Sequence, residues 1–442
     1  MPLSITVIFC ILLYMAQPVR NIIKEVHPEL VVEKPTRTLI IDGGNLLRVS
    51  FKDNKVNSEG VHYGGVFQFL LQVKLMLRKT TFDYVYCFFD DEDSGILRFQ
   101  LYNAYKANRE TKKYAEHEFL SAYGERVESK IRKWKEKYAH KKYEATTNNL
   151  RGEIDAYKEK KISREYLFNK YSEESAKEII RIAEKEILDE NFARERDILL
   201  KYFGELYIRY VFDAKTEGDD LIAYYVAHKK ANDLVYIMST DEDLTQLISD
   251  TVCIWNPIKK IAYSMKNFKE THGYPVENVA IKKIFCGDTS DNIGNIKELS
   301  ETRLFELMPE MRDRPVTIDE VINRAQEKIE ERIAAKKKPL EWHKNIVNGV
   351  SNKDYDGDFY EINEKIINLK KPLLTKEAKE ELDSMMYEVQ DPEGRSFQNL
   401  YDYILEDGID ELKDTNSFAR FFEEYKLFAD REVKRYNDSL KK

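Results

Sequence analysis

Acidic side chains of the kind that bind divalent cations are concentrated between residues 216 and 247. They form two groups, the first being Glu217, Asp219 and Asp220 and the second Asp241 and Asp243. An apolar helix pattern (221–227) and a short strand of β-type residues (235–238) separate the two groups. An acidic helix start and an acidic strand end meet at one edge of an α/β sheet, where the ligands of open sheets collect.

The same two groups have a structural explanation. Residues 216–219 and 240–243 both fit the capping-box pattern, in which acids of the first helical turn complement the helix dipole. A cap needs only one or two acids, and nothing about capping gathers several caps in one place. The case for chemistry therefore depends on whether other carboxylates reach the same edge.

Three further segments are expected to bring acids there. Residues 38–42 and 84–89 have the continuous apolar pattern of buried parallel strands, and they end at Asp42 and Asp90. An apolar helix pattern (65–77) connects them, so the segment reads as a right-handed crossover. Asp288 and Asp291 follow a predicted helix over 276–285. The fold class is therefore α/β with a mostly parallel central sheet.

So many carboxylates at one edge would repel one another unless cations were present. Oxygen ligands without Cys or His select hard ions, so the expected cofactor is a pair of Mg²⁺ ions, for which Mn²⁺ can substitute. Two such ions about 4 Å apart suit phosphodiester hydrolysis. The basic and aromatic segment 98–110 would hold the phosphate backbone beside them. The residues alone thus predict a metal-dependent nuclease. The candidate metal ligands are Asp42, Asp90, Glu217, Asp219, Asp220, Asp241, Asp243, Asp288 and Asp291.

Composition fits a folded protein of two or three domains. The chain has 442 residues, 42% of them hydrophobic, and a net charge of −8, whereas residues 106–142 hold twelve Lys and Arg against six Asp and Glu. Four widely spaced cysteines argue against zinc and disulfides and favour a reducing, cytoplasmic location. No phosphate-binding G-x-x-x-x-G-K-[ST] loop occurs, so nothing suggests nucleotide hydrolysis.

We divide the chain by composition into an N-terminal extension (1–36), an α/β core (37–109 and 203–270), a charged helical insertion (110–202), a helical domain (271–385) and C-terminal helices (386–442). The insertion predicts three or four charged helices, with breaks near 146–149 and Gly152. It is either a solvated arm or a nucleic-acid contact. The apolar stretch 3–16 is either a signal or anchor segment or a dispensable extension.

Six motifs occur in the order IIDGGN, FFDDE, YKANR, EGDD, STDEDL and CGDTSDNIG. In this order they resemble the 5′ nuclease superfamily of flap endonucleases and 5′-3′ exonucleases, and within it most of all the T-even phage ribonuclease H type. The similarity covers about 38–109 and 207–310 and extends more weakly to about 382. It implies a PIN-like core with a helical arch and a helix-three-turn-helix. The implied activity is metal-dependent 5′-3′ exonuclease and flap endonuclease cleavage of DNA or RNA-primer/DNA during replication, by a phage-encoded enzyme.

The resemblance also assigns roles to residues. It implies that the nine acids hold two divalent metals and that Lys106 and Arg109, at the base of the arch, contact the scissile phosphate. Residues 276–307 resemble the duplex-gripping helix-three-turn-helix, but no second glycine pair follows Gly294, so the hairpin and any potassium site in it would be altered. The implied nucleic-acid contacts are Arg98, Tyr105, Lys106, Arg109, Lys282 and Lys283.

The implied partners are DNA and RNA/DNA hybrids with 5′ ends or flaps, and a single-strand-binding protein or other replisome component. We expect a monomer without membrane contact. Two other functions compete. A PIN-type endoribonuclease would need neither the pair Asp288 and Asp291 nor the helix-turn-helix, and a non-catalytic nucleic-acid-binding scaffold predicts that metal ligands have been lost. The chain keeps both features and every acidic position.

Overall fold

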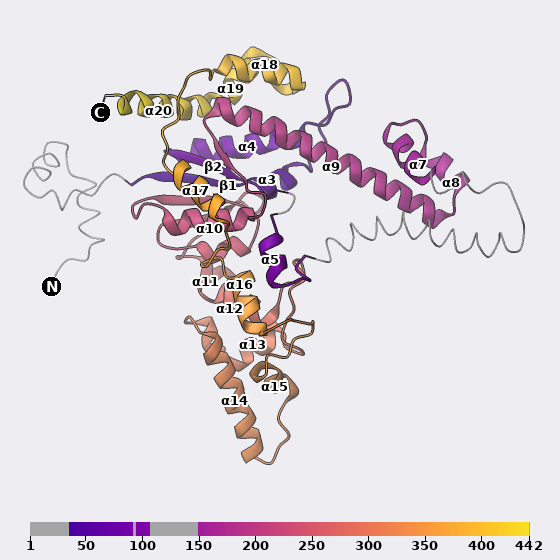
Figure 1. The fold of residues 1–442 in the computed structure, drawn as a ribbon. Helices are drawn as coiled ribbons and strands as arrows, with labels where there is room; N and C mark the ends of the chain where they lie inside the picture. The colour runs from indigo at the N-terminus through magenta and orange to yellow at the C-terminus, as the bar shows by residue number, and fades with distance from the viewer. Residues whose placement is uncertain (1–34, 92–93, 107–148, 442) are drawn as a thin grey trace, which may run out of the picture.

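A computed structural model describes residues 35–91, 94–106 and 149–441 (Figure 1). Its centre is a six-stranded sheet with the strand order β3-β2-β1-β4-β5-β6. Neighbouring strands run parallel except for the last pair, β5 and β6, which is antiparallel. The strands are β1 (Arg37–Asp42), β2 (Tyr84–Phe88), β3 (Arg209–Val211), β4 (Leu234–Met238), β5 (Val252–Asn256) and β6 (Ile261–Tyr263). The expected mostly parallel α/β fold is confirmed.

The apolar runs form the middle of this sheet because both of its faces are covered. All five residues of β2 are buried, and so are the four central residues of β1. The register aligns the carboxyl ends of the strands, since Asp42 lies opposite Phe88 of β2 and Ile41 lies opposite Met238 of β4. The residues that follow these three strands are therefore brought to one edge.

One face of the sheet packs against α3 (Gly43–Ser50), α4 (Gly64–Lys79) and the second half of α9 (Glu173–Leu206). The C-terminal helices complete this layer, as Figure 1 shows at the top of the molecule. They are α18 (Phe397–Asp407), η4 (Asp410–Leu412), α19 (Thr415–Phe421) and α20 (Glu423–Ser439). The ring of Tyr425 is fully buried there and its hydroxyl donates to the carbonyl of Leu70 in α4 at 2.7 Å.

The other face packs against α10 (Gly218–His228) and continues into the helical domain. Along the chain this layer contains η2 (Asp243–Leu247), α11 (Phe268–His272), α12 (Asn278–Cys286), α13 (Glu301–Leu307) and η3 (Pro309–Arg312). The helices α14 (Ile318–Ala334) and α15 (Glu341–Val347) form a hairpin that projects away from the sheet (Figure 1). The chain then returns through α16 (Phe359–Ile367) and α17 (Lys376–Met385).

The long helix α9 links the core to a small outlying unit. Its first half packs against α7 (Asn149–Lys158) and α8 (Arg164–Lys170) around Ile154, Leu167 and Ile179, while its second half lies in the core. The helix runs unbroken past residue 203, where the composition suggested the start of a core segment. The predicted break at Gly152 is wrong, because α7 continues through that residue.

Several earlier expectations fall on residues outside the described part of the chain. These are the N-terminal stretch 3–16, Arg109, and residues 110–148 of the insertion. Among the described residues, no helix is both long enough and apolar enough to cross a membrane.

Candidate active site

The carboxyl edge of the sheet carries a cavity of about 380 Å³. Its lining contains eight of the nine predicted acids, together with Arg98, Tyr105, Lys106 and Lys283, and neither His nor Cys is among the described residues that line it. These acids come from the ends of β1, β2 and β4, from the start of α10 and from the loop after α12. They are Asp42, Asp90, Glu217, Asp219, Asp241, Asp243, Asp288 and Asp291.

Asp42 and Asp219 are held in a strongly negative environment. Burial, followed by the charges of Asp90 and Asp241, raises the pKa of Asp42 to about 7, although a hydrogen bond from Ser239 (Oγ to Oδ2, 2.6 Å) lowers it. Burial and then the charges of Asp241, Asp42 and Asp90 raise the pKa of Asp219 well above its usual range. Both carboxylates would ionise more readily beside a cation.

Asp90 also has a local structural role. Its Oδ1 accepts a hydrogen bond from the backbone N–H of Gly218 at 2.7 Å, which satisfies the first free donor of α10. Glu217 occupies the N-cap position of that helix, yet its side chain makes no capping bond. The capping-box interpretation of residues 216–219 is therefore wrong, and the side chain of Glu217 is free to enter the cavity.

Asp243, Asp288 and Asp291 form a second acidic group. One carboxylate oxygen of each lies within 4.8 Å of the other two. The ammonium of Lys283 on α12 pairs with Asp243 and lies 2.7 Å from Asp288. Burial alone would raise the pKa of Asp288, but hydrogen bonds from Lys283 and Ser290 lower it to about 2. Asp288 therefore keeps its negative charge, and the ammonium of Lys283 offsets part of the charge of the group.

Lys106 enters the cavity opposite these acids. Its ammonium pairs with Glu217, and its backbone N–H donates to the carbonyl of Asp291 at 2.8 Å. Tyr105 binds the same two residues through its hydroxyl, 3.0 Å from Glu217 and 3.3 Å from Asp291. Burial lowers the pKa of Lys106, but the charges of Glu217 and Asp291 outweigh it, and the net shift is upward. Lys106 therefore remains an ammonium at neutral pH.

Asp220 and Arg98 are almost completely buried, Asp220 behind the cavity and Arg98 in its wall. Asp220 is only 2% exposed and does not line the cavity, because its carboxylate pairs with the guanidinium of Arg98 and accepts from the N–H of Leu373 at 3.0 Å. Arg98 is 5% exposed and also pairs with Glu217. The expectation that Arg98 belongs to a basic surface is wrong, since an arginine between two carboxylates is turned inward. It holds α5 (Ile96–Leu101) against α10.

The segment from α12 to α13 has the helix–loop–helix form expected from the sequence. Lys282 lies outside the cavity, with its ammonium 3.5 Å from Glu301 and over the ring of Tyr274. Where the second glycine pair is missing, Asn295 pairs with a neighbouring strand-like segment: its N–H donates to Asn352 Oδ1 and its carbonyl accepts from the N–H of Asn352, both at 3.0 Å.

Sequence reasoning missed three residues of this edge. Ser239, directly after β4, donates to Asp42 and accepts from the N–H of Asp241 at 2.9 Å, so it fixes two of the acids. Asn45 accepts from the N–H and hydroxyl of Thr240 at 2.9 and 2.8 Å. Arg48 is exposed and lines the cavity, with its guanidinium over the ring of Phe192. Ser239 lies in the motif STDEDL and Asn45 in the motif IIDGGN. Their position next to the predicted acids could have marked both as residues of the site.

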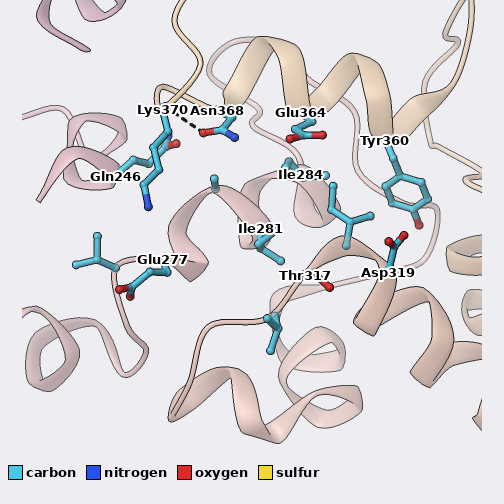
Figure 2. Close-up of a pocket in the computed structure, with 14 residues that line it drawn as sticks. Gln246, Glu277, Ile281, Ile284, Thr317, Asp319, Tyr360, Glu364, Asn368 and Lys370 are labelled. Atoms are coloured by element: carbon cyan, nitrogen blue, oxygen red, sulfur yellow. Dashed lines mark hydrogen bonds between the residues drawn. The ribbon is translucent and has the colours of Figure 1, made fainter. Parts of the chain in front are cut away.

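Figure 2 shows a second cleft, of about 490 Å³, between α12, α16 and the start of α14. Its floor includes Ile281 and Ile284, and Glu277, Asp319 and Glu364 stand around it. Its lining holds three dispersed acids where the first cavity holds eight of the predicted ones, so the chemistry expected of clustered carboxylates belongs to the first cavity.

Comparison with known proteins gives a consistent result. The family model of the N-terminal, resolvase-like domain of 5′-3′ exonucleases matches residues 141–273. A 5′-3′ exonuclease of Mycoplasmopsis pulmonis is 34% identical over 87 residues, which cover 19% of this chain and 29% of that protein. A 5′-3′ exonuclease of Buchnera aphidicola is 32% identical over 114 residues, or 25% and 39% of the two chains.

The T5 5′-exonuclease, in a structure with bound zinc, aligns with a TM-score of 0.48 at 15% identity over 89% of this chain and 99% of that one. Over the segments that match in sequence, the chain is similar to 5′-3′ exonucleases. It spans between 11% and 39% of the length of the curated relatives that it matches.

Proposed function

We propose that this protein is a divalent-metal-dependent nuclease that hydrolyses phosphodiester bonds as a 5′-3′ exonuclease and flap endonuclease. The observation that carries the proposal is the cavity itself, which is lined by nine carboxylates, the eight predicted ones and Glu242, and by Lys106. Carboxylate oxygens without His or Cys suit hard cations. Burial and then the charges of neighbouring acids raise the pKa of Asp42 and of Asp219, so a cation placed among these acids would be favoured.

The acids divide into two candidate ligand groups. Asp42, Asp90, Asp219 and Asp241, with Glu217 beside them, would hold one ion, and Asp243, Asp288 and Asp291 would hold a second. When bound, two such ions supply an activated water and offset the charge that develops on the phosphate oxygens. We propose Mg²⁺ as the working ion and Mn²⁺ as a substitute, because both take oxygen ligands.

Lys106 is proposed to contact the scissile phosphate. Three contacts fix it: the ion pair with Glu217, its backbone bond to Asp291, and the neighbouring ring of Tyr105. Its charge persists at neutral pH, so it can stabilise negative charge that increases on the phosphate during the reaction. Lys283, which pairs with Asp243 and Asp288, also lines the cavity and is proposed to act on the substrate backbone.

For the substrate we propose DNA, and RNA primers on DNA, with free 5′ ends or 5′ flaps. The setting would be replication in the cytoplasm of a phage-infected cell, with a monomeric enzyme and a single-strand-binding protein or other replisome component as partner. The six ordered motifs support this finer assignment through their resemblance to the T-even phage ribonuclease H type.

The testing experiment is cleavage of three 5′-labelled substrates: a DNA flap, an RNA primer on DNA, and a plain single strand. Each is incubated with Mg²⁺ and with EDTA, for the wild type and for Asp219→Asn. We expect metal-dependent cutting near the junction of the flap or primer, lost in the variant. Cutting of single-stranded RNA alone would favour the PIN-type endoribonuclease, and tight binding without cutting in any metal would favour the scaffold.

A further inference from the structure

The hairpin of α14 and α15 ends in an unusually basic turn. From residue 332 to residue 340 the chain has four bases and no acid. Lys336, Lys337 and Lys338, the tip lysines, are all exposed, and no ion pair links them to any acid in the described part of the chain. Nearby lysines behave differently, since Lys328 pairs with Glu331 and Lys344 pairs with Glu341.

The turn holds the tip lysines in fixed positions. The N–H of Lys336 donates to the carbonyl of Ile333 at 2.9 Å, and the N–H of Lys337 donates to the carbonyl of Arg332 at 2.8 Å, the two bonds of a Schellman motif. The guanidinium of Arg332 donates from Nε to the carbonyl of Lys338 at 2.8 Å and closes the turn.

Lys336 occupies a left-handed backbone position of this turn, where glycine would be more stable. Lys336 has φ +54°, a conformation in which glycine is preferred at helix ends. A side chain there costs about 1 kcal/mol relative to glycine. Replacing Lys336 by glycine therefore removes the charge without straining the turn.

The hairpin is anchored to the element that carries Lys283 into the cavity. Asn278, at the start of α12, donates to the carbonyls of Met311 and Arg314 at 2.7 and 2.8 Å and accepts from the N–H of Val316 at 2.9 Å. This clamp fixes the entry to α14, whose Val321 and Ala325 are fully buried. The cavity, α12 and the hairpin are thus joined by packed structure.

The anchored hairpin places its positive charge at the far end of α14, which projects away from the sheet (Figure 1). The 17 residues of α14 span about 25 Å at 1.5 Å per residue. A duplex rises 3.4 Å per base pair, so this length corresponds to about 7 base pairs. Duplex DNA stays straight over such a distance, whereas a single strand does not.

We propose that the tip lysines bind the phosphate backbone of duplex DNA extending from the cavity, at a distance that short duplexes do not reach. The inference rests on the proposed function for the presence of nucleic acid in the cavity. Lysines without an exposed aromatic partner suit contact with phosphates rather than base stacking, so duplex is the expected ligand.

The test is binding by fluorescence anisotropy in EDTA, between 50 and 200 mM NaCl. The probes are two DNAs with the same 5′ single-stranded tail and either 5 or 24 base pairs of duplex. The variant combines Lys336→Gly, Lys337→Ala and Lys338→Ala. We expect it to lose about tenfold in affinity for the long duplex at low salt and less than about twofold for the short one. Its salt dependence for the long duplex should fall by about 2 to 3 in log–log slope.

The matched control carries Lys426→Ala, Lys434→Ala and Lys441→Ala on or next to α20, at the opposite end of the molecule in Figure 1. It removes the same charge and should bind both probes as the wild type does. Equal losses on both duplex lengths, no loss on either, or the same loss in the control would each overturn the proposal. Thermal unfolding shows whether the variant folds, and Lys336→Gly alone should be at least as stable as the wild type.

Cleavage is measured in a separate assay, so the nuclease proposal and the duplex-contact proposal can be rejected independently of each other. If the wild type cuts no substrate in Mg²⁺ but shows the length-dependent loss, the nuclease assignment is wrong and the duplex contact remains. If it cuts but shows no such loss, the nuclease assignment remains and the contact is wrong.

Discussion

Carboxylates at the two ends of the parallel strands have different surroundings. At the amino end, Asp233 is fully buried, and its carboxylate accepts hydrogen bonds from the hydroxyls of Thr38, Tyr225 and Tyr387 at 3.0, 3.1 and 2.8 Å. At the carboxyl end, nine carboxylates line one cavity. Burial raises the pKa of Asp42 there, and the charges of Asp90 and Asp241 raise it further.

The difference lies in the number of carboxylates brought together. A single buried acid surrounded by hydroxyls is a structural tie, because its oxygens are hydrogen-bonded within the protein. Acids gathered close to one another cost stability unless a cation joins them. Stability at the amino end and the proposed metal binding at the carboxyl end should therefore be separable by substitution.

The largest expected effect is that of Asp219→Asn on cleavage. The change removes one candidate metal ligand with little change in shape, and we expect the turnover number to fall at least about a thousandfold. Binding of nucleic acid should persist, because the cavity becomes less negative. Single-turnover kinetics and anisotropy on one flap substrate measure both quantities. Asp250→Asn, an exposed acid at the amino end of β5, makes the same charge change and should leave both unaltered.

Lys106→Ala should reduce turnover more than affinity, by about 10- to 100-fold, because its contact strengthens as charge develops on the phosphate. Lys106→Arg should recover part of the rate, since it keeps the charge. The rate constant at saturating substrate is the deciding quantity. A variant with weaker binding and an unchanged rate constant would show that Lys106 only holds the substrate.

At the amino end, Asp233→Ala should destabilise the fold by about 2 kcal/mol, because three hydroxyls lose their acceptor. Its effect on turnover at a temperature where the variant is folded should be small. Urea unfolding and flap cleavage, measured on the same preparation, check both. A variant of normal stability with impaired turnover would reverse the comparison between the two ends.

The variant Tyr387→Phe tests the role of Asp233 through the pH dependence of stability. Burial raises the pKa of Asp233, while hydrogen bonds from Tyr387, Thr38 and Tyr225 lower it. A raised folded-state pKa means that the folded protein binds the proton more tightly than the unfolded chain, so this stability is present at low pH and is lost as pH rises through the folded value. Removing the Tyr387 donor raises that pKa further. The variant should therefore lose about 1 kcal/mol at pH 7 and less at pH 4. Urea unfolding at both pH values measures this, and equal losses would contradict it.

Much of the sheet and its acidic edge could be predicted from sequence. The strands around Asp42, Asp90 and Asp241 are continuous apolar runs that end in acids, and this pattern fixes both their burial and their polarity. The strands β3 and β6 were not predicted, because each has three residues and takes its form from pairing with a neighbouring strand.

The orientation of individual charges could not be predicted. Asp219 and Asp220 are adjacent in sequence, yet only Asp219 lines the cavity, because successive residues of a helix point in different directions. Asp220 instead meets Arg98, which lies 122 positions earlier. No local pattern reveals a partner so distant, and for the same reason the inward position of Arg98 was missed.

The most direct test of the central claim is thermal unfolding of the wild type and Asp219→Asn, each with EDTA and with increasing Mg²⁺. If the carboxyl-end acids form a metal site, Mg²⁺ will stabilise the wild type progressively with its concentration. Asp219→Asn will be at least as stable as the wild type in EDTA, because repulsion is relieved, and will gain much less from Mg²⁺. A wild type whose unfolding temperature does not change with Mg²⁺, or a variant that gains as much as the wild type, would contradict the account.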